Sequence, residues 1–221
     1  MNIKTIIWDI DGVLIWHHPS EPMYDWRYKM AHTPILDAWE KFQKTQYWSS
    51  CLSGQESKTL QQFLKFLHKN DLPKDDAETM VDMWLEGNLI PNIPAIKKLR
   101  QFKNAGYRCA LGTNQDCLRK PYLQRWLKKN GLHTLPVFIS SEIGAAKPQA
   151  RFYTAIEQSL HTRPANTILI DDTLSNILGA KKNGWHGLHI HDAYKMTPEL
   201  WEDFYLPDFF TEEGTQAAMK M

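Results

Sequence analysis

The sequence predicts an α/β protein, a doubly wound parallel sheet with a small all-helical domain inserted near its beginning. Three observations predict this fold class. Short β-branched segments alternate with amphipathic segments over most of the chain, which is typical of parallel strands joined by helices. One long stretch near the N-terminus carries helical patterns alone. Polar residues follow the predicted strands at their carboxyl ends, where open α/β sheets bind ligands.

Five short apolar segments have the length and the flanking residues of strands. The first is rich in isoleucine and leads directly into two aspartates. Because helical patterns separate the segments, right-handed crossovers are expected to make the strands parallel. The predicted strands are residues 3–8, 107–113, 136–140, 167–171 and 187–191.

Helical periodicity fills the intervals between these strands. Residues 94–106 place Ile96, Leu99 and Phe102 on one face, and residues 120–131 repeat the pattern. Both segments end at a glycine, a common residue just beyond a helix C-terminus. Further helices of the same kind are expected at residues 151–160 and 174–184.

Residues 16–91 depart from this alternation, because they contain amphipathic segments and no convincing strand. Pro91 and Pro94 then precede the return to the α/β pattern. We therefore expect residues 16–91 to form a helical cap domain, and residues 1–15 and 92–221 to form the α/β core. The amphipathic segments of the cap are residues 35–42, 59–70 and 77–88.

The composition is that of an ordinary globular protein, with 43% hydrophobic and 23% charged residues among 221. The formal net charge of +1 argues against a dedicated nucleic-acid-binding protein and against attachment to an acidic membrane. No apolar segment approaches the roughly 20 residues of a membrane span, and Asp9 and Asp11 interrupt the apolar N-terminus. Three cysteines without metal-binding spacing favour a reducing compartment, so we expect a cytoplasmic protein. From the charge and the lack of a membrane span, we expect neither nucleic-acid nor membrane partners.

Most of the predicted strands deliver polar groups to the same rim of the sheet. Several carboxylates at one place repel one another unless a cation joins them, and Mg²⁺ prefers oxygen ligands and commonly shares its shell with phosphate. A lysine and a hydroxyl complement phosphate oxygens, while one carboxylate can act as a nucleophile and a second as a general acid and base. The set therefore predicts phosphoryl transfer with Mg²⁺ as cofactor. In chain order these groups are Asp9 and Asp11, Thr113 and Asn114, Lys147, and Asp171 and Asp172.

Taken in order, these motifs resemble those of the haloacid dehalogenase (HAD) superfamily of phosphohydrolases. The stretch "DIDGV" (9–13) is similar to the nucleophile loop of that superfamily, and "TN" (113–114), "KP" (147–148) and "DD" (171–172) are similar to its three later motifs. The resemblance covers residues 1–15 and 92–191. It implies a Rossmann-like core and a cap, inserted after the first motif, that closes over the site and selects the leaving group.

The resemblance also implies a role for each residue. Asp9 would be the nucleophile that takes the phosphoryl group, and Asp11 would be the general acid and base. The implied phosphate-binding groups are Thr113, Lys147 and the backbone amide of Asn114, with its side chain as a further donor. The implied ligands of Mg²⁺ are Asp9, the backbone carbonyl of Asp11, Asp172, and Asp171 either directly or through water.

The sequence thus predicts a Mg²⁺-dependent phosphatase, acting on a small phosphorylated metabolite through an aspartyl-phosphate intermediate. Sugar phosphates, nucleotides and cofactor phosphates are all open as substrates, because the cap sequence contains no readable specificity pattern. The alternatives are a phosphomutase, which shares these residues, and a non-catalytic binding or regulatory module on the same fold. A dehalogenase is disfavoured because it needs neither Asp11 nor the carboxylates at 171–172. The chain is expected to be a monomer or a homodimer.

Two groups of residues rich in aromatic side chains each allow two interpretations. The group that follows the nucleophile loop lines the substrate pocket in one interpretation and forms cap core in the other; its members are Trp16, His17, His18 and Trp26. The segment 192–221, which includes Trp201, is expected either to pack on the core or to mediate dimerisation.

Overall fold

The computed structural model describes residues 3–15, 33–54, 59–86, 89–190 and residue 201. Its centre is a parallel five-stranded sheet with the order β3-β2-β1-β4-β5. The strands are β1 (Thr5–Trp8), β2 (Arg108–Thr113), β3 (Val137–Ile139), β4 (Thr167–Asp171) and β5 (His186–His189). Each predicted strand is confirmed, with ends that differ from the prediction by at most two residues, and every pairing is parallel.

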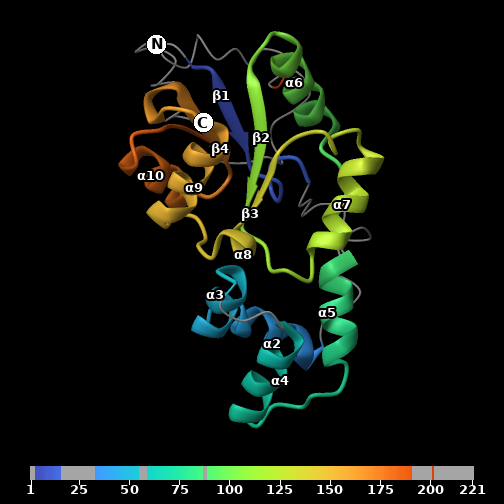
Figure 1. Ribbon diagram of the computed structural model, residues 1–221. Helices are drawn as coiled ribbons and strands as arrows, with labels where there is room; N and C mark the ends of the chain where they lie inside the picture. Colours follow the sequence, from blue (N-terminus) through green and yellow to red (C-terminus); the bar gives the residue numbers. More distant parts are fainter. Residues whose placement is uncertain (1–2, 16–32, 55–58, 87–88, 191–200, 202–221) are drawn as a thin grey trace.

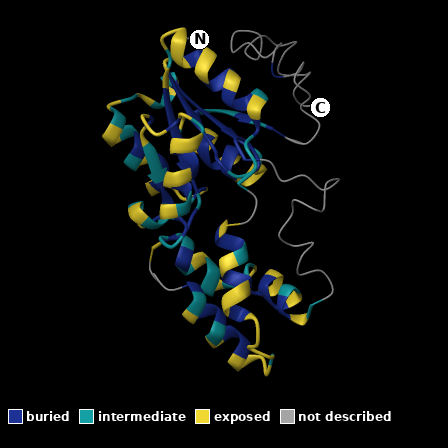
Figure 2. Ribbon diagram, turned by 90° about the vertical axis from the view of Figure 1, so that its right-hand side faces the viewer, coloured by how far each residue is buried: buried dark blue, intermediate teal, exposed yellow. Residues whose placement is uncertain are grey.

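Helices cover both faces of the sheet, as the doubly wound fold requires (Figure 1). Alternation along β1 assigns the faces, because Ile6 and Trp8 pack with one group of helices and Ile7 packs with the other. On the first face lie α6 (Ile93–Asn104) and α7 (Lys120–Lys129), and on the second lie α9 (Ala150–Leu160) and α10 (Leu174–Lys182). All four residues of β1 are buried, so this strand is the centre of the core (Figure 2).

Four helices lie together beyond the carboxyl ends of the strands, and we call them the helical insert (Figure 1). They are α2 (Pro34–Phe42), α3 (Gln46–Leu52), α4 (Thr59–Lys69) and α5 (Ala77–Glu86). The insert has its own apolar cluster, in which the Trp39 ring lies 5.0 Å from the Phe63 ring and 5.5 Å from the Trp84 ring. The predicted helical segments of this region are confirmed, and α3 was not predicted.

The chain enters and leaves the insert at neighbouring points. Ile15 forms an isolated antiparallel bridge with Pro91, and the Asn92 backbone N–H donates to the Leu14 carbonyl at 2.8 Å. The Asn92 side chain is fully buried, donates to the Val13 carbonyl at 2.8 Å and accepts from the Ala95 N–H at the start of α6. One asparagine therefore fastens both connections to the core.

Trp201 packs on the first face of the sheet, where its ring stacks on Trp8 with centroids 5.9 Å apart. Its side chain is 1% exposed, so at this position the C-terminal segment packs on the core. The rest of segment 192–221, and with it the expected dimer contact, lies outside the described residues. Among the described residues, no helix has the length and apolar character that crossing a membrane requires.

Candidate active site

Asp9 lies directly after the buried strand β1, at the rim of the sheet. Its N–H donates to the Ile170 carbonyl of β4 at 2.9 Å, and its Oδ1 accepts from the Ile10 N–H at 2.7 Å. The loop then turns at Gly12, whose φ of 78° favours glycine. A Cβ at Gly12 would lie 2.0 Å from Asp172 Oδ2, so a side chain here would displace that carboxylate.

Lys147 is the cation at the centre of this rim. Its Nζ lies 3.0 Å from Asp9 Oδ1 and donates to Asp171 Oδ2 at 2.6 Å and to the Gly112 carbonyl at 2.8 Å. Burial alone would lower the pKa of Lys147, but the carboxylates of Asp171 and Asp9 outweigh it and raise the pKa. The ammonium group therefore stays charged and links the first strand end to the fourth.

The two aspartates after β4 have different environments. Asp171 is fully buried, and its oxygens accept from Lys147, from the Thr173 N–H at 2.8 Å and from Asn176 Nδ2 at 3.0 and 3.1 Å. Asp172 is partly exposed and accepts from the Thr173 hydroxyl at 3.3 Å. Asp171 thus orients Lys147 and the start of α10, whereas Asp172 faces the opening of the site toward Gly12.

These carboxylates form a cluster that fits a divalent cation. One oxygen from each of Asp9, Asp171 and Asp172 lies within 4.8 Å of the others. Burial, followed by repulsion from Asp171, raises the pKa of Asp9 well above its usual value and raises that of Asp172 to about 6. A single lysine therefore does not compensate the charge of the cluster, and hard oxygen donors under mutual repulsion are the chemistry that Mg²⁺ binds.

The second strand end contributes Thr113 and Asn114. Thr113 is buried, and its hydroxyl accepts from Gln115 Nε2 at 3.2 Å. The Asn114 side chain pairs with the backbone of Lys147, donating to its carbonyl at 2.9 Å and accepting from its N–H at 2.8 Å. This pairing joins the second and third motifs, and it occupies the side chain of Asn114.

Asp11 is held by residues that the sequence did not single out. Arg119 binds it with both terminal nitrogens, Nη1 to Oδ2 at 2.8 Å and Nη2 to Oδ1 at 3.0 Å. Gln115 Nε2 also donates to Asp11 Oδ2. Both partners lie in the turn between β2 and α7, which looks like a polar surface loop in the sequence although each is at least 95% buried.

Asp116, in the same turn, connects the core to the helical insert. Its Oδ1 accepts from the Arg119 N–H at 3.0 Å, and its Oδ2 accepts from the hydroxyl of Thr59, the first residue of α4. Burial raises the pKa of Asp116. An aspartate shortly before a helical segment, here four residues before Lys120 and with Pro121 in the first turn, is a helix-start signal that could have drawn attention to this turn.

A second close approach between insert and core lies at Gly54, whose φ is 68°. A Cβ at this position would lie 2.1 Å from the Ser141 carbonyl oxygen in α8 (Ser140–Ile143). The proposed pocket residues of the connection into the insert, Trp16, His17, His18 and Trp26, lie outside the described residues.

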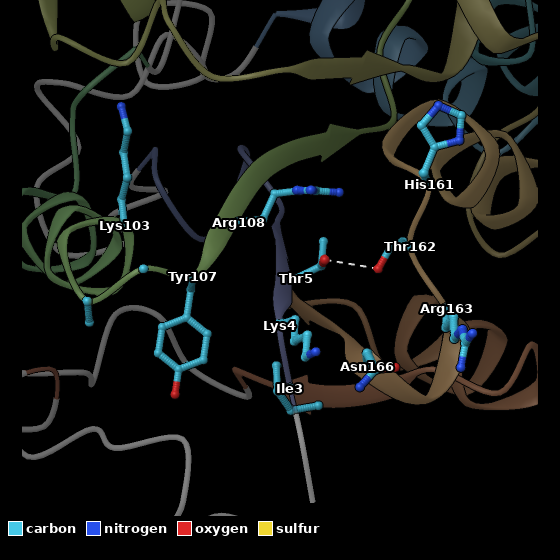
Figure 3. Close-up of a pocket in the computed structure, with 12 residues that line it drawn as sticks. Ile3, Lys4, Thr5, Lys103, Tyr107, Arg108, His161, Thr162, Arg163 and Asn166 are labelled. Carbon is cyan, nitrogen blue, oxygen red and sulfur yellow. Dashed lines mark hydrogen bonds between the residues drawn. The ribbon is translucent and has the colours of Figure 1, made fainter.

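A cavity of about 1100 Å³ lies at the opposite, amino end of the sheet (Figure 3). Five of its lining residues are basic, none is acidic, and all five are exposed. Two helices, α6 and α9, end beside it, and Arg108 donates to the Leu160 carbonyl at the end of α9. Cations near helix C-termini are the ordinary arrangement. The basic lining residues are Lys4, Lys103, Arg108, His161 and Arg163.

Comparison with known proteins agrees with this geometry. The haloacid dehalogenase-like hydrolase family matches residues 3–184, so the chain belongs to that family. A sesquiterpene phosphatase of Aspergillus oryzae is 30% identical over 119 residues, which span 52% of this chain and 58% of that protein.

Solved structures show the same fold at low sequence identity. A HAD family enzyme from Bacteroides thetaiotaomicron, in complex with magnesium and inorganic phosphate, has a TM-score of 0.63 and 18% identity, covering 85% of this chain and 94% of that chain. The L-2-haloacid dehalogenase from Xanthobacter autotrophicus has a TM-score of 0.60 and 19% identity, covering 98% of this chain and 88% of that chain. The fold thus serves both phosphate and haloacid chemistry, and the site residues must decide between them.

Proposed function

We propose that this HAD-like hydrolase is a Mg²⁺-dependent phosphatase of small organic phosphates. The observation that carries the proposal is the buried contact of Asp9, Lys147 and Asp171, with Asp172 beside them. A cluster that keeps several carboxylates around one lysine suits a cation and a phosphate together. The similarity to a phosphatase, and the magnesium and phosphate in a structure of the same fold, support this choice.

In the proposed reaction, a carboxylate oxygen of Asp9 attacks phosphorus and the bond from phosphorus to the leaving oxygen breaks. Asp11 gives a proton to that oxygen, and it then takes a proton from the water that hydrolyses the aspartyl phosphate. Lys147, the Thr113 hydroxyl and the Asn114 backbone amide hold the transferring oxygens, which carry the negative charge. Lys147 also keeps Asp9 oriented through the 3.0 Å contact.

Bound Mg²⁺ would neutralise charge on the phosphoryl oxygens. The residues that would hold it are Asp9, Asp172 and the backbone carbonyl of Asp11. Asp171 completes the set through water in this proposal, because its oxygens already accept from N–H donors of Lys147, Thr173 and Asn176. Its direct role is to orient Lys147.

We also propose that the helical insert is a cap domain that selects the leaving group, with residues 16–91 as the cap and residues 1–15 and 92–221 as the core. Contacts at Thr59–Asp116 and Gly54–Ser141 place the insert against the loops that surround the site. A cap in this position would exclude water during transfer to Asp9.

The presence of the acid–base residue Asp11 and of the carboxylates at 171–172 favours a phosphatase over a dehalogenase for this chain. A dehalogenase displaces halide with one carboxylate. That reaction requires neither a proton donor at Asp11 nor the mutually repelling carboxylates at 171–172. The energy cost of keeping these buried carboxylates together is explained when a cation and a phosphate bind among them.

The test is phosphate release from a panel of phosphate esters that includes sugar phosphates, nucleotides and isoprenyl phosphates, the last because of the sesquiterpene phosphatase relative. We expect turnover of at least one ester with Mg²⁺, its loss with EDTA and its recovery when Mg²⁺ is restored. Purified Asp9→Asn protein is the matched control. Turnover that is unaffected by EDTA, or equal in the control, would contradict the proposal.

A further inference from the structure

Arg119 makes the strongest unexplained polar contact of the site. Its guanidinium binds both oxygens of Asp11 in a fork, at 2.8 and 3.0 Å, and Nη1 also donates to Gln115 Oε1 at 3.1 Å. The Arg119 side chain is only 6% exposed. A buried bidentate pair of this kind is strong and geometrically specific.

The same guanidinium lies where the core meets the helical insert. Its Cζ is 5.4 Å from the centroid of the Trp84 ring in α5, within the range of a cation–π contact. Trp84 belongs to the apolar cluster of the insert. Arg119 therefore contacts both the proposed acid Asp11 and the helical insert that we propose as the cap.

One N–H of the Arg119 guanidinium points to a further acceptor. Within the described residues, its Nε is buried without a hydrogen-bond partner. A buried donor without an acceptor is unfavourable, so an acceptor that is not part of the described residues would be favourable at this position. A guanidinium with a spare N–H is suited to a carboxylate or a phosphate, which accept from two or more of its donors.

The pairing with Asp11 conflicts with the proposed reaction unless something replaces it. Both oxygens of Asp11 accept from Arg119, so at least one must be released before Asp11 can reach the leaving oxygen. Release leaves a buried guanidinium without its counter-charge, which is strongly unfavourable. A negative group on the substrate, next to the leaving oxygen, would take the place of Asp11 and remove this cost.

We propose that Arg119 is a specificity-determining residue that recognises a second anionic group on the substrate, carried by the leaving group. The substrate class is then a diphosphate ester or a phosphorylated carboxylic acid, rather than a phosphate ester of a neutral alcohol. This inference rests on the proposed phosphatase function. It adds that Arg119 exchanges Asp11 for the substrate anion when substrate binds.

Two pairs of substrates separate the charged from the neutral leaving group. Geranyl diphosphate is compared with geranyl phosphate, and phosphoglycolate with ethyl phosphate, so that each pair differs by one anionic group. We expect kcat/KM of the wild type to favour the charged member of one pair by about 10- to 100-fold, as hydrogen bonds to a charged group imply. The favoured pair identifies the anion as phosphate or carboxylate.

Arg119→Ala should remove this preference, lowering kcat/KM about 10- to 100-fold for the charged member and much less for the neutral one. Arg119→Lys keeps one positive charge without the fork, so its preference should be intermediate. Arg125→Ala is the matched control, because Arg125 lies on α7 over the Tyr122 ring and makes no contact with Asp11 that the structure describes. Thermal melting verifies that each variant is folded.

Binding provides a readout that does not depend on turnover. In an Asp9→Asn background, calorimetric titration with the favoured charged substrate should show about 10- to 100-fold weaker binding when Arg119→Ala is added. An equal loss of kcat for both members of each pair, with unchanged binding, would mean that Arg119 only positions Asp11 and would overturn the inference. A wild type that hydrolyses none of the esters contradicts the phosphatase function instead.

Discussion

The two ends of the sheet are built from the same strands, but their basic side chains differ in burial and in pairing. At the carboxyl end, Lys147 and Arg119 are buried, and each contacts carboxylates at hydrogen-bond distance. At the amino end, the five basic residues of the cavity are exposed (Figure 3). Exposed cations remain solvated at little cost, whereas buried ones require partners. The two ends therefore differ in how their charges are compensated, and the carboxyl end is the one that we propose as the active site, although the larger cavity lies at the amino end.

The largest expected effect at the carboxyl end is that of Asp9→Asn. An amide cannot attack phosphorus, so phosphate release should fall by more than about 1000-fold, in the range found for lost nucleophiles. Steady-state kinetics with the best ester of the panel measures the loss. Circular dichroism should show an unchanged fold, and activity near that of the wild type would mean that another residue is the nucleophile.

Lys147→Met should affect stability as well as activity. It leaves the buried carboxylates of Asp9 and Asp171 without their shared cation, so the free energy of unfolding should fall by about 3 kcal/mol. Denaturant unfolding measures the change. Lys120→Ala is the matched control, because the Lys120–Glu142 pair is exposed and should contribute less than about 1 kcal/mol. Equal losses in the two variants would refute the contrast between buried and exposed pairs.

Asp172→Asn should stabilise the metal-free protein, because it removes a repelled carboxylate. The pKa of Asp172 is raised from 3.8 to about 6 by burial and then by Asp171, so the folded state favours the protonated form. Wild-type stability should therefore fall relative to the variant as pH rises from about 4 to 6, by about 3 kcal/mol at most, and the gap should stay constant above this range.

Thermal melting of both proteins between pH 4 and 8, in the presence of EDTA, measures this gap. Added Mg²⁺ should stabilise the wild type at pH 7 and stabilise Asp172→Asn less. A variant that is less stable than the wild type at pH 7 in EDTA would show that the carboxylate cluster is not under repulsion.

The smallest effect is expected at the amino end of the sheet. Arg163→Ala removes an exposed cation from the cavity wall, and its effect on stability should stay within about 0.5 kcal/mol. We expect kcat/KM to remain within about twofold of the wild type, since no described contact joins Arg163 to the site. A tenfold loss in the same kinetic assay would connect the two ends and break the comparison.

Most of the fold could be predicted because its segments carry strong local patterns. The β1 segment is short, apolar and β-branched, which indicates a strand. The α7 segment repeats its apolar residues at helical spacing, which indicates a helix. Helix α3 was missed because it has only seven residues with two serines at its centre, too short a segment for the helical spacing of Tyr47, Trp48 and Cys51 to stand out. The strand order depends on pairing between distant segments, such as β1 with β4, which local periodicity does not specify.

The sequence predicted some residues of the candidate site and missed others. Asp9, Lys147 and Asp171 follow strand ends, so the direction of the parallel sheet brings them together, and the structure places all three in contact. Gln115 and Arg119 lie in a turn whose polar sequence is typical of an exposed loop. Arg119 is buried against Trp84 of the insert and Gln115 against Asp11 and Ser140 of the core, and these contacts between distant segments are not readable in the local sequence.

The most direct test of the central claim, that Asp9 takes the phosphoryl group, is covalent trapping. Asp11→Asn protein is mixed with p-nitrophenyl phosphate and Mg²⁺, quenched in acid, digested and examined by mass spectrometry. This ester needs no proton for its leaving group, while hydrolysis of the intermediate lacks its base, so the phosphorylated enzyme should accumulate. We predict a phosphoryl group on Asp9. Release of phosphate without any phosphorylated protein, or phosphorylation of another residue, would contradict the claim.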